Sequence, residues 1–425
     1  MNTVKNGIKA VVLAAGKGTR LRTEGVDLPK VLRQAAGRPL LGYVLEELSV
    51  LEKEDVVLVV GYEREKVLAA YPEYPHAVQE PQQGTGHAVQ CAREALAGFD
   101  GSVLVCYGDM PLMRRATYES LIETHKREGN DCTLLSAVSD EELPYGRIVR
   151  KSDGSFSHIV EDKDCTPEEK AIRELNVGVY VFESGPLWEA IDQLRPNNAQ
   201  GEYYLTDCVE MMERRTAYKS ANPDIVLGAN TRGALLELNQ LARLRKLSQL
   251  MDEGVSFITL DGIIIGADVK IGCDTTILPN TTILGNTTIG KGCTIGANSH
   301  IENCTIGDNV QLNNVQAYDS TVENSVKIGP FAQLRPGTTI REGVKIGDFV
   351  EIKNSDIGVN TAVAHLTYVG DSDVGRGVNF GCGCVTANYD GINKFRTKIG
   401  DHAFIGCNTN LIAPVEVGDN ATTAA

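Results

Sequence analysis

The chain has 425 residues, 42% of them hydrophobic, and a formal net charge of -15 at pH 7. This length exceeds what one ordinary hydrophobic core organises, so two domains are expected. The acidic balance argues against non-specific nucleic-acid binding. The sequence also lacks an uncharged apolar run of the ~18 residues that a membrane span needs.

The start of the chain and its cysteines predict a cytoplasmic location. The first seven residues lack the apolar core of a secretory signal. The 11 cysteines are scattered without a CxxC pair, which argues against zinc ribbons and thioredoxin-type sites. Free thiols in a reducing compartment are the simplest interpretation.

Residues 1 to about 228 alternate apolar runs with helical stretches, the pattern of an open α/β sheet. The predicted strands cover residues 10–13, 55–60, 102–107, 132–138 and 178–182, and the predicted helices cover 86–96 and 115–128.

A glycine-rich turn follows the first predicted strand. Gly16 and Gly18 let backbone N–H groups approach a phosphate, and Arg20 and Lys30 add fixed positive charge beside the turn. This arrangement suits a nucleoside triphosphate that must be held for in-line attack. The spacings of a P-loop and of a dinucleotide-binding turn are both absent. The string from Lys9 to Leu21, with its downstream Leu-Pro-Lys, resembles the signature of the sugar-phosphate nucleotidyltransferases.

Two oxygen-bearing side chains predict a Mg²⁺ site in this domain. Asp109 follows the apolar strand ending at Tyr107, and carboxyl ends of parallel strands form the ligand crevice. Asn230 supplies a second oxygen at the end of the domain. Gln79 and the run from Gly84 to Ala88 are expected to close over a base.

Residues 230–252 are predicted to form one long linker helix. Leucines recur at near-helical spacing, and the basic side chains between them are expected to point outward. The leucines are Leu235, Leu238, Leu241, Leu244 and Leu247, and the basic residues are Arg243, Arg245 and Lys246.

After Gly262 the hydrophobic period becomes six. Such a period predicts a triangular parallel β-helix of roughly nine coils, with one inward aliphatic side chain for each face. The aliphatic positions are Ile265, Ile271, Ile277, Ile283, Ile289, Ile295, Ile301, Ile306, Leu312, Ile328, Leu334, Ile340, Ile346, Ile352, Ile399, Ile405, Leu411 and Val417. Residues 387–398 interrupt the period with a polar segment, where binding residues are expected.

Over essentially its whole length the chain resembles the bacterial bifunctional enzymes that make UDP-N-acetylglucosamine. The resemblance implies a Rossmann-like nucleotidyltransferase domain (1–229), the linker helix (230–252) and a left-handed β-helix acetyltransferase domain (253–425). It implies a homotrimer that uses Mg²⁺, UTP, acetyl-CoA and sugar phosphates, without a nucleic-acid or membrane partner. It also implies a role in peptidoglycan synthesis and cell shape.

The same resemblance implies site residues in the first domain. Arg20 and Lys30 are implied to stabilise the triphosphate. The implied nucleotide-binding residues are Leu13, Ala14, Gly16, Lys30, Gln79, Gly84 and Thr85. The implied sugar-binding residues are Gly146, Glu161, Asn176 and Tyr203, and the implied Mg²⁺ ligands are Asp109 and Asn230.

In the second domain the resemblance makes His365 the base of acetyl transfer, with Glu351 orienting it. Histidine suits that role near neutral pH. The implied acceptor site comprises Arg335, Lys353, Tyr368 and Asn379, and the implied acetyl-CoA site comprises Cys382, Asn388, Tyr389, Lys394, Cys407 and Ala425. The two cysteines are expected to be wall residues rather than nucleophiles. Family members continue into a tail beyond the position of Ala425, so a truncated acetyltransferase domain is expected.

Two alternatives stay open. One is another sugar nucleotidyltransferase with a β-helix tail, such as a glucose-1-phosphate adenylyl- or thymidylyltransferase, which would leave the phrases around His365 and Asn388 unexplained. The other is a regulatory protein of the same architecture, like subunits of translation-initiation exchange factors. The presence of Arg20, Lys30 and Asp109 argues against that alternative.

Overall fold

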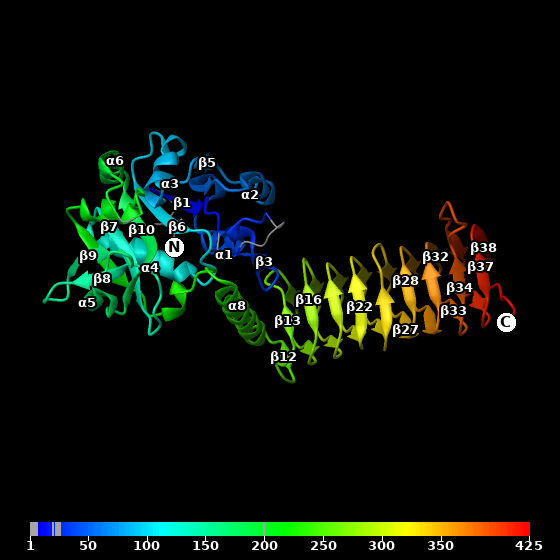
Figure 1. Ribbon diagram of the computed structural model, residues 1–425. Coiled ribbons are helices and arrows are strands. Elements are labelled where there is room, and N and C mark those ends of the chain that lie inside the picture. The colour runs from blue at the N-terminus through cyan, green and yellow to red at the C-terminus, as the bar shows by residue number, and fades with distance from the viewer. Residues whose placement is uncertain (1–6, 19–20, 22–26, 199) are drawn as a thin grey trace. The chain divides into compact units, whose positions relative to one another are not determined.

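The computed structural model describes residues 7–18, 21, 27–198 and 200–425, and divides the chain into two compact units, Met1–Gln240 and Leu241–Ala425 (Figure 1). Within the described part of the chain, no helix combines the length and apolarity needed to cross a bilayer. The domain limits at residues 229 and 252 remain predictions.

The first unit is built on a mixed sheet with strand order β11-β7-β10-β6-β1-β4-β5, to which β8 and β9 are attached. Strands β1, β4, β5 and β6 run parallel, whereas β10 runs antiparallel to β6 and β7. The bounds are β1 (Ile8–Ala14), β4 (Val56–Val60), β5 (His76–Val78), β6 (Ser102–Tyr107), β7 (Cys132–Val138), β8 (Arg147–Arg150), β9 (Phe156–Val160), β10 (Glu174–Glu183) and β11 (Arg215–Lys219). A separate hairpin pairs β2 (Gln34–Ala35) with β3 (Arg38–Pro39).

The central strands are apolar because both faces of the sheet are covered. All five residues of β4 are buried, and side chains on alternate sides of β1 join two different hydrophobic clusters. Each of the five predicted strands in this unit is confirmed, with ends shifted by up to a few residues.

The helices of the first unit are α1 (Leu40–Glu47), α2 (Arg64–Ala70), α3 (Thr85–Cys91), α4 (Arg115–Glu128), α5 (Pro167–Lys170), α6 (Ser184–Gln193) and α7 (Leu205–Glu210). Short 3₁₀ turns cover η2 (Lys30–Leu32), η3 (Lys53–Asp55), η4 (Glu94–Leu96) and η5 (Pro223–Val226). The prediction of one helix over 86–96 was wrong, because the chain tightens after Cys91, where the Ala92 N–H donates to the Val89 carbonyl at 3.0 Å. The helix over 115–128 is confirmed.

Helix α8 (Arg232–Asp252) confirms the predicted long helix, but its faces differ from the prediction. Lys246 is buried, Leu244 is 46% exposed, and Arg243 donates to the Leu260 and Ile263 carbonyls. A spacing of three residues falls short of the 3.6-residue helical turn. The predicted leucines therefore wind around the helix instead of forming one stripe.

The second unit is a parallel β-helix of three nine-stranded sheets, as the six-residue period predicts. The first sheet contains β12 (Ser256–Phe257), β15 (Thr276–Ile277), β18 (Thr294–Ile295), β21 (Gln311–Leu312), β24 (Lys327–Ile328), β27 (Lys345–Asp348), β30 (Ala362–His365), β33 (Asn379–Phe380) and β36 (Phe404–Ile405). The second contains β13 (Ile264–Ile265), β16 (Thr282–Leu284), β19 (His300–Glu302), β22 (Val315–Tyr318), β25 (Ala332–Leu334), β28 (Glu351–Lys353), β31 (Tyr368–Gly370), β34 (Val385–Ala387) and β37 (Asn410–Ile412). The third contains β14 (Lys270–Ile271), β17 (Thr288–Ile289), β20 (Thr305–Ile306), β23 (Thr321–Val322), β26 (Thr339–Ile340), β29 (Asp356–Ile357), β32 (Ser372–Val374), β35 (Thr397–Ile399) and β38 (Val415–Val417).

The predicted aliphatic positions line the interior of the coils. All of them are buried in one cluster except Val417, which is partly buried against it. Many corners between the sheets hold Asn or Asp at positive φ, such as Asn298 at 60° and Asn354 at 45°. Asn and Asp tolerate this conformation better than other non-glycine residues. Sharp corners joined by two- to four-residue strands therefore follow from the repeat itself.

Candidate functional site

A cavity of about 500 Å³ lies in the first unit at the carboxyl ends of its parallel strands. Residues after β1, β5 and β6 line it, together with residues from η2, α3 and the approach to α8. The lining residues are Leu13, Ala15, Gly16, Gly18, Lys30, Val31, Gln79, Gln82, Gly84, Thr85, Ala88, Tyr107, Asp109, Glu202 and Asn230.

Lys30, Asp109 and Asn230 meet in this cavity. The Lys30 ammonium donates to Asn230 Oδ1 at 2.7 Å and forms an ion pair with Asp109 Oδ2. The Lys30 and Asp109 side chains are only 15% and 19% exposed. Residues that are distant in sequence thus place a carboxylate and an amide oxygen around one cation, which is the donor set that Mg²⁺ prefers.

Two glycines are required by the shape of the cavity. Gly18 has a φ of 57°, and a Cβ there would lie 2.8 Å from the Lys30 Cβ. Gly84 has a φ of 107°, and a Cβ there would lie 2.6 Å from the Tyr203 carbonyl oxygen. A side chain at either position would displace the cavity wall, so both turns need glycine.

The other predicted nucleotide contacts divide into two groups. Leu13, Gly16, Gln79 and Thr85 line the cavity, and Gln79 Nε2 donates to the Gly84 carbonyl at 2.8 Å. Ala14 is buried beneath the lining, in the hydrophobic core. Arg20, the other predicted triphosphate ligand, lies outside the described residues.

Of the predicted sugar residues, Glu161 lines a smaller cavity of about 130 Å³, together with Tyr204 and Thr206. Glu161 Oε1 accepts from Thr206 Oγ1 at 2.9 Å. Burial raises the pKa of Glu161, although the Thr206 hydrogen bond opposes this shift. The Asn176 side chain is buried. Its Nδ2 donates to the Tyr180 hydroxyl at 2.7 Å, and its Oδ1 accepts from the Gly178 N–H at 3.1 Å.

Tyr107 lines the larger cavity. Burial raises its pKa, the charges of Glu161 and Asp109 add to that shift, and Thr85 hydrogen-bonds its hydroxyl. Gly178 makes room for the ring, because a Cβ there would lie 2.2 Å from a Tyr107 ring carbon. Tyr107 was not among the predicted site residues, although its place before Asp109 could have indicated it.

Backbone contacts place Tyr203 and Gly146 in the same region. The Tyr203 carbonyl accepts from the Gly86 N–H at 2.8 Å, and its N–H donates to Gln83. The Gly146 carbonyl accepts from the Asn176 N–H at 2.8 Å. The structure therefore joins these two predicted sugar residues to the walls of the cavities through their main chains.

The second unit carries the predicted acceptor residues on and beside its second sheet. Glu351 and Tyr368 are paired on neighbouring strands β28 and β31, and Lys353 ends β28. Arg335 Nη1 donates to Glu351 Oε1 at 2.8 Å, so this carboxylate is engaged by arginine rather than by His365. Asn379 lies on β33 of the first sheet.

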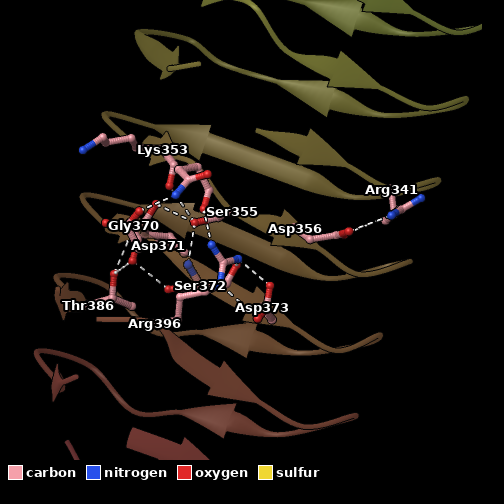
Figure 2. Close-up of polar contacts among 12 residues, drawn as sticks. Arg341, Lys353, Ser355, Asp356, Gly370, Asp371, Ser372, Asp373, Thr386 and Arg396 are labelled. Carbon is pink, nitrogen blue, oxygen red and sulfur yellow. Dashed lines mark hydrogen bonds and ion pairs between the residues drawn. The ribbon is translucent and has the colours of Figure 1, made fainter. Parts of the chain in front are cut away.

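Arg341 lies apart from Arg335 and Lys353. It follows β26 of the third sheet, where it pairs with Asp356 and Glu323. Figure 2 shows this pair on a different side of the β-helix from Lys353.

His365 stands in a column of side chains at the corner between the first and second sheets. Asp348 is its partner on the preceding coil. The pairing of Asn379 with Ala362 and with Phe404 places Cys382 and Cys407 on the two following coils. Both cysteines are at least partly exposed, and all 11 cysteines are free. Asp348 was not predicted, because its position beside His365 depends on the register between coils.

The predicted acetyl-CoA residues after β34 surround a loop that leaves the coil. Asn388 is buried, Tyr389 is 59% exposed, and an isolated bridge pairs Tyr389 with Lys394. Ala425 is exposed on the last coil. The polar interruption predicted at 387–398 is therefore an excursion from the solenoid.

Comparisons with known proteins agree with both units. Residues 10–251 match the model of the MobA-like NTP transferase domain, and residues 268–303, 286–315 and 319–354 match the bacterial transferase hexapeptide (six repeats). The bifunctional protein GlmU of Clostridium novyi is 45% identical over 98% of this chain and 92% of its own length. That of Acetivibrio thermocellus is 45% identical over 98% of this chain and 91% of its own length.

The fold and these matches define a transferase that joins a nucleotidyltransferase domain to a left-handed β-helix of hexapeptide repeats. The chain belongs to the GlmU family. It is a bifunctional N-acetylglucosamine-1-phosphate uridylyltransferase and glucosamine-1-phosphate N-acetyltransferase.

Proposed function

We propose that uridylyl transfer takes place in the 500 Å³ cavity of the first unit. The phosphate of N-acetylglucosamine-1-phosphate attacks the α-phosphorus of UTP, a P–O bond to that phosphorus forms, and pyrophosphate leaves. The observation that carries this assignment is the meeting of Lys30, Asp109 and Asn230 at the carboxyl ends of the parallel strands.

The residues present fit a Mg²⁺ ion. Asp109 and Asn230 already direct oxygens at one cation, the Lys30 ammonium, and Mg²⁺ commonly takes one or two protein oxygens besides phosphate and water. Bound there, Mg²⁺ would neutralise charge on the phosphate oxygens. Lys30 then holds the triphosphate, and Arg20 is proposed to assist it.

The nucleotide and the sugar occupy adjoining parts of the site. Leu13, Gly16 and the segment containing Gln79, Gly84 and Thr85 hold the nucleotide, and Ala14 supports them from the core beneath. Gly146, Glu161, Asn176 and Tyr203 hold the sugar. Tyr107 supports this division, because it lines the nucleotide cavity together with Thr85, and the charge of Glu161, which lines the smaller cavity, acts on its hydroxyl.

Acetyl transfer is assigned to the corner of the β-helix that carries His365. The imidazole removes a proton from the amine of glucosamine-1-phosphate as the nitrogen attacks the acetyl carbonyl. A C–N bond forms, the C–S bond of acetyl-CoA breaks, and the proton passes to the departing thiolate. Among the described residues no side chain hydrogen-bonds the exposed His365 ring, which leaves it accessible to substrate.

The active acetyltransferase is proposed to be a homotrimer in which neighbouring copies share a site. An apolar corner runs beside His365: the Phe331 and Phe349 rings stack at 5.3 Å, and Leu366 occupies the same corner one coil further. These side chains are 54%, 58% and 60% exposed. A second copy packed on this corner would bury them at the edge of the acetyl-transfer site.

The proposal includes a cytoplasmic location, where UTP and acetyl-CoA are available, and no nucleic-acid or membrane partner. Purified protein with UTP, Mg²⁺ and N-acetylglucosamine-1-phosphate should release pyrophosphate, and with acetyl-CoA and glucosamine-1-phosphate should release CoA. Turnover of glucose-1-phosphate with ATP or dTTP in preference to these substrates would favour the other nucleotidyltransferases. No turnover with any of them would favour the regulatory alternative.

A further inference from the structure

A buried carboxylate lies beside the predicted acceptor residues. Asp371 is 5% exposed and has a φ of 48°, at the corner between β31 and β32. Its N–H donates to the Lys353 carbonyl at 3.0 Å, and its own carbonyl accepts from the Thr397 N–H at 3.0 Å. Burying a carboxylate destabilises the fold unless its oxygens are hydrogen-bonded. The partners of Asp371 therefore indicate the role of this side chain.

Two asparagines occupy both oxygens of Asp371. Asn354, at the equivalent corner of the preceding coil, donates its Nδ2 to Oδ1 at 2.5 Å, and Asn388 donates its Nδ2 to Oδ2. Burial alone would raise the pKa of Asp371, but these hydrogen bonds and the nearby charges of Lys353 and Lys394 hold it below its usual value. Asp371 is therefore ionised at neutral pH.

The charges of two lysines, Lys353 and Lys394, act on this carboxylate. Contact with Lys394 lowers the pKa of Lys353, burial and the charge of Arg335 lower it further, and the charge of Asp371 opposes these shifts. Among the described residues, neither lysine has an acidic partner within ion-pair distance. Figure 2 shows Lys353 and Asp371 on neighbouring coils, on the same side of the β-helix. Two neighbouring lysines without an acidic partner offer positive charge to a dianion.

Asp371 also anchors the excursion that carries Lys394. Asn388 begins the excursion, and its carbonyl accepts from the Phe395 N–H at 2.9 Å. Arg396 ends it, donating to Asp373 Oδ2 at 3.1 Å and to the Asn354 carbonyl at 3.1 Å. The hydrogen bond from Asn388 to Asp371 thus fixes the start of the loop, and the loop's own hydrogen bonds carry that placement to Lys394.

We propose that Asp371 is a positioning residue for acetyl transfer: its carboxylate sets Asn388 at the start of the loop and so places Lys394 beside Lys353, where the phosphate of the sugar-1-phosphate acceptor is received. This inference rests on the proposed acetyl-acceptor site. Asp371 itself touches neither substrate.

Asp371→Asn tests the proposal. An amide there places an N–H₂ group against one of the two asparagine donors and so loosens the start of the loop that carries Lys394. We expect binding of glucosamine-1-phosphate, measured by calorimetry, to weaken about tenfold or more. KM for that substrate should rise by a similar factor. Uridylyl transfer should not change.

Asp356→Asn is the matched control. It makes the same substitution at a carboxylate that pairs with Arg341 on the third sheet, at 2.6 Å (Figure 2). We expect its binding of glucosamine-1-phosphate to stay within twofold of the unsubstituted protein. Equal losses in the two variants, or tight binding by Asp371→Asn, would overturn the proposal.

The double variant Asp371→Asn with Asn388→Asp covers the case in which the single variant fails to fold. It reverses the donor and acceptor of that hydrogen bond and retains the negative charge, while the amide oxygen at 371 can still accept from Asn354. Recovery of the fold together with binding supports the proposal, and recovery of the fold without binding refutes it. If the unsubstituted protein binds glucosamine-1-phosphate but transfers no acetyl group, the proposed function fails, while the binding comparison still decides the role of Asp371.

Discussion

Removing the Asp109 carboxylate should abolish most uridylyl transfer and spare acetyl transfer. In the structure this carboxylate forms an ion pair with Lys30, and both side chains are largely buried, at 19% and 15% exposed. A hydrogen bond to a charged group contributes about 1.5–3 kcal/mol. Since each 1.36 kcal/mol is about tenfold in rate, losing a contact of that strength from the transition state predicts a decrease of about ten- to 150-fold. Loss of a proposed Mg²⁺ ligand adds to it, so Asp109→Ala should be slower by about a hundredfold or more.

Pyrophosphate release from UTP and N-acetylglucosamine-1-phosphate measures the first activity, and CoA release measures the second in the same preparation. The control is Asp55→Ala, which removes a carboxylate paired with Lys9 at 3.5 Å, just before β4 and thus away from the carboxyl ends that line the cavity. That variant should keep both activities. A decrease of less than threefold in uridylyl transfer by Asp109→Ala would refute the assignment, and equal loss of both activities would show that the two sites are not independent.

Three further predictions concern the second unit. His365→Ala should lower the acetyl-transfer rate about a hundredfold or more. The rate should recover as pH rises, because the substrate amine then deprotonates in solution. A variant that keeps most of its rate at neutral pH would make His365 structural. Cys382→Ala and Cys407→Ala should each retain acetyl transfer within about threefold, as wall residues do, whereas loss of about a hundredfold by either would indicate a nucleophilic thiol. Phe349→Glu should shift the light-scattering mass from trimer to monomer and remove acetyl transfer but not uridylyl transfer; a stable monomer before substitution would refute the shared site.

The β-helix could be predicted from sequence because its period is tied to one physical position, the inward side chain of each face. The arrangement of the site on its surface could not be predicted from this period, because the coils differ in length. Thr282 pairs with His300, but His300 pairs with Gln316, and Val385 pairs with Asn410 across the excursion. Columns such as the one that places Asp348 beside His365 therefore depend on the register of each coil, which a repeat pattern alone does not give.

The nucleotide cavity could be predicted more completely, because topology gathers the carboxyl ends of parallel strands at one edge. Asp109 and Gly16 follow strands that pair in the sheet, so their approach follows from the strand order. The ion pair between Lys30 and Asp109 and the contacts of Tyr107 could not be predicted from the sequence. Each depends on side-chain packing inside the cavity. The prediction for the leucines of α8 was wrong for a simpler reason: a three-residue spacing does not keep side chains on one face of a helix.

Glu161 offers a test in which stability and substrate binding change in opposite directions. Burial raises its pKa above that of an exposed glutamate. Its contribution to stability is therefore fully present below the unfolded-state pKa of about 4.3, and it is lost as pH rises through the raised folded-state value. Glu161→Gln removes this titration, so the variant should match the Tm of the unsubstituted protein near pH 4 and exceed it near pH 8. Because the same carboxylate is proposed to bind the sugar, KM for N-acetylglucosamine-1-phosphate should rise severalfold at pH 8 while acetyl transfer stays unchanged. A Tm difference that does not vary with pH would show that Glu161 is not destabilised by its burial, and an unchanged KM would remove it from the sugar site.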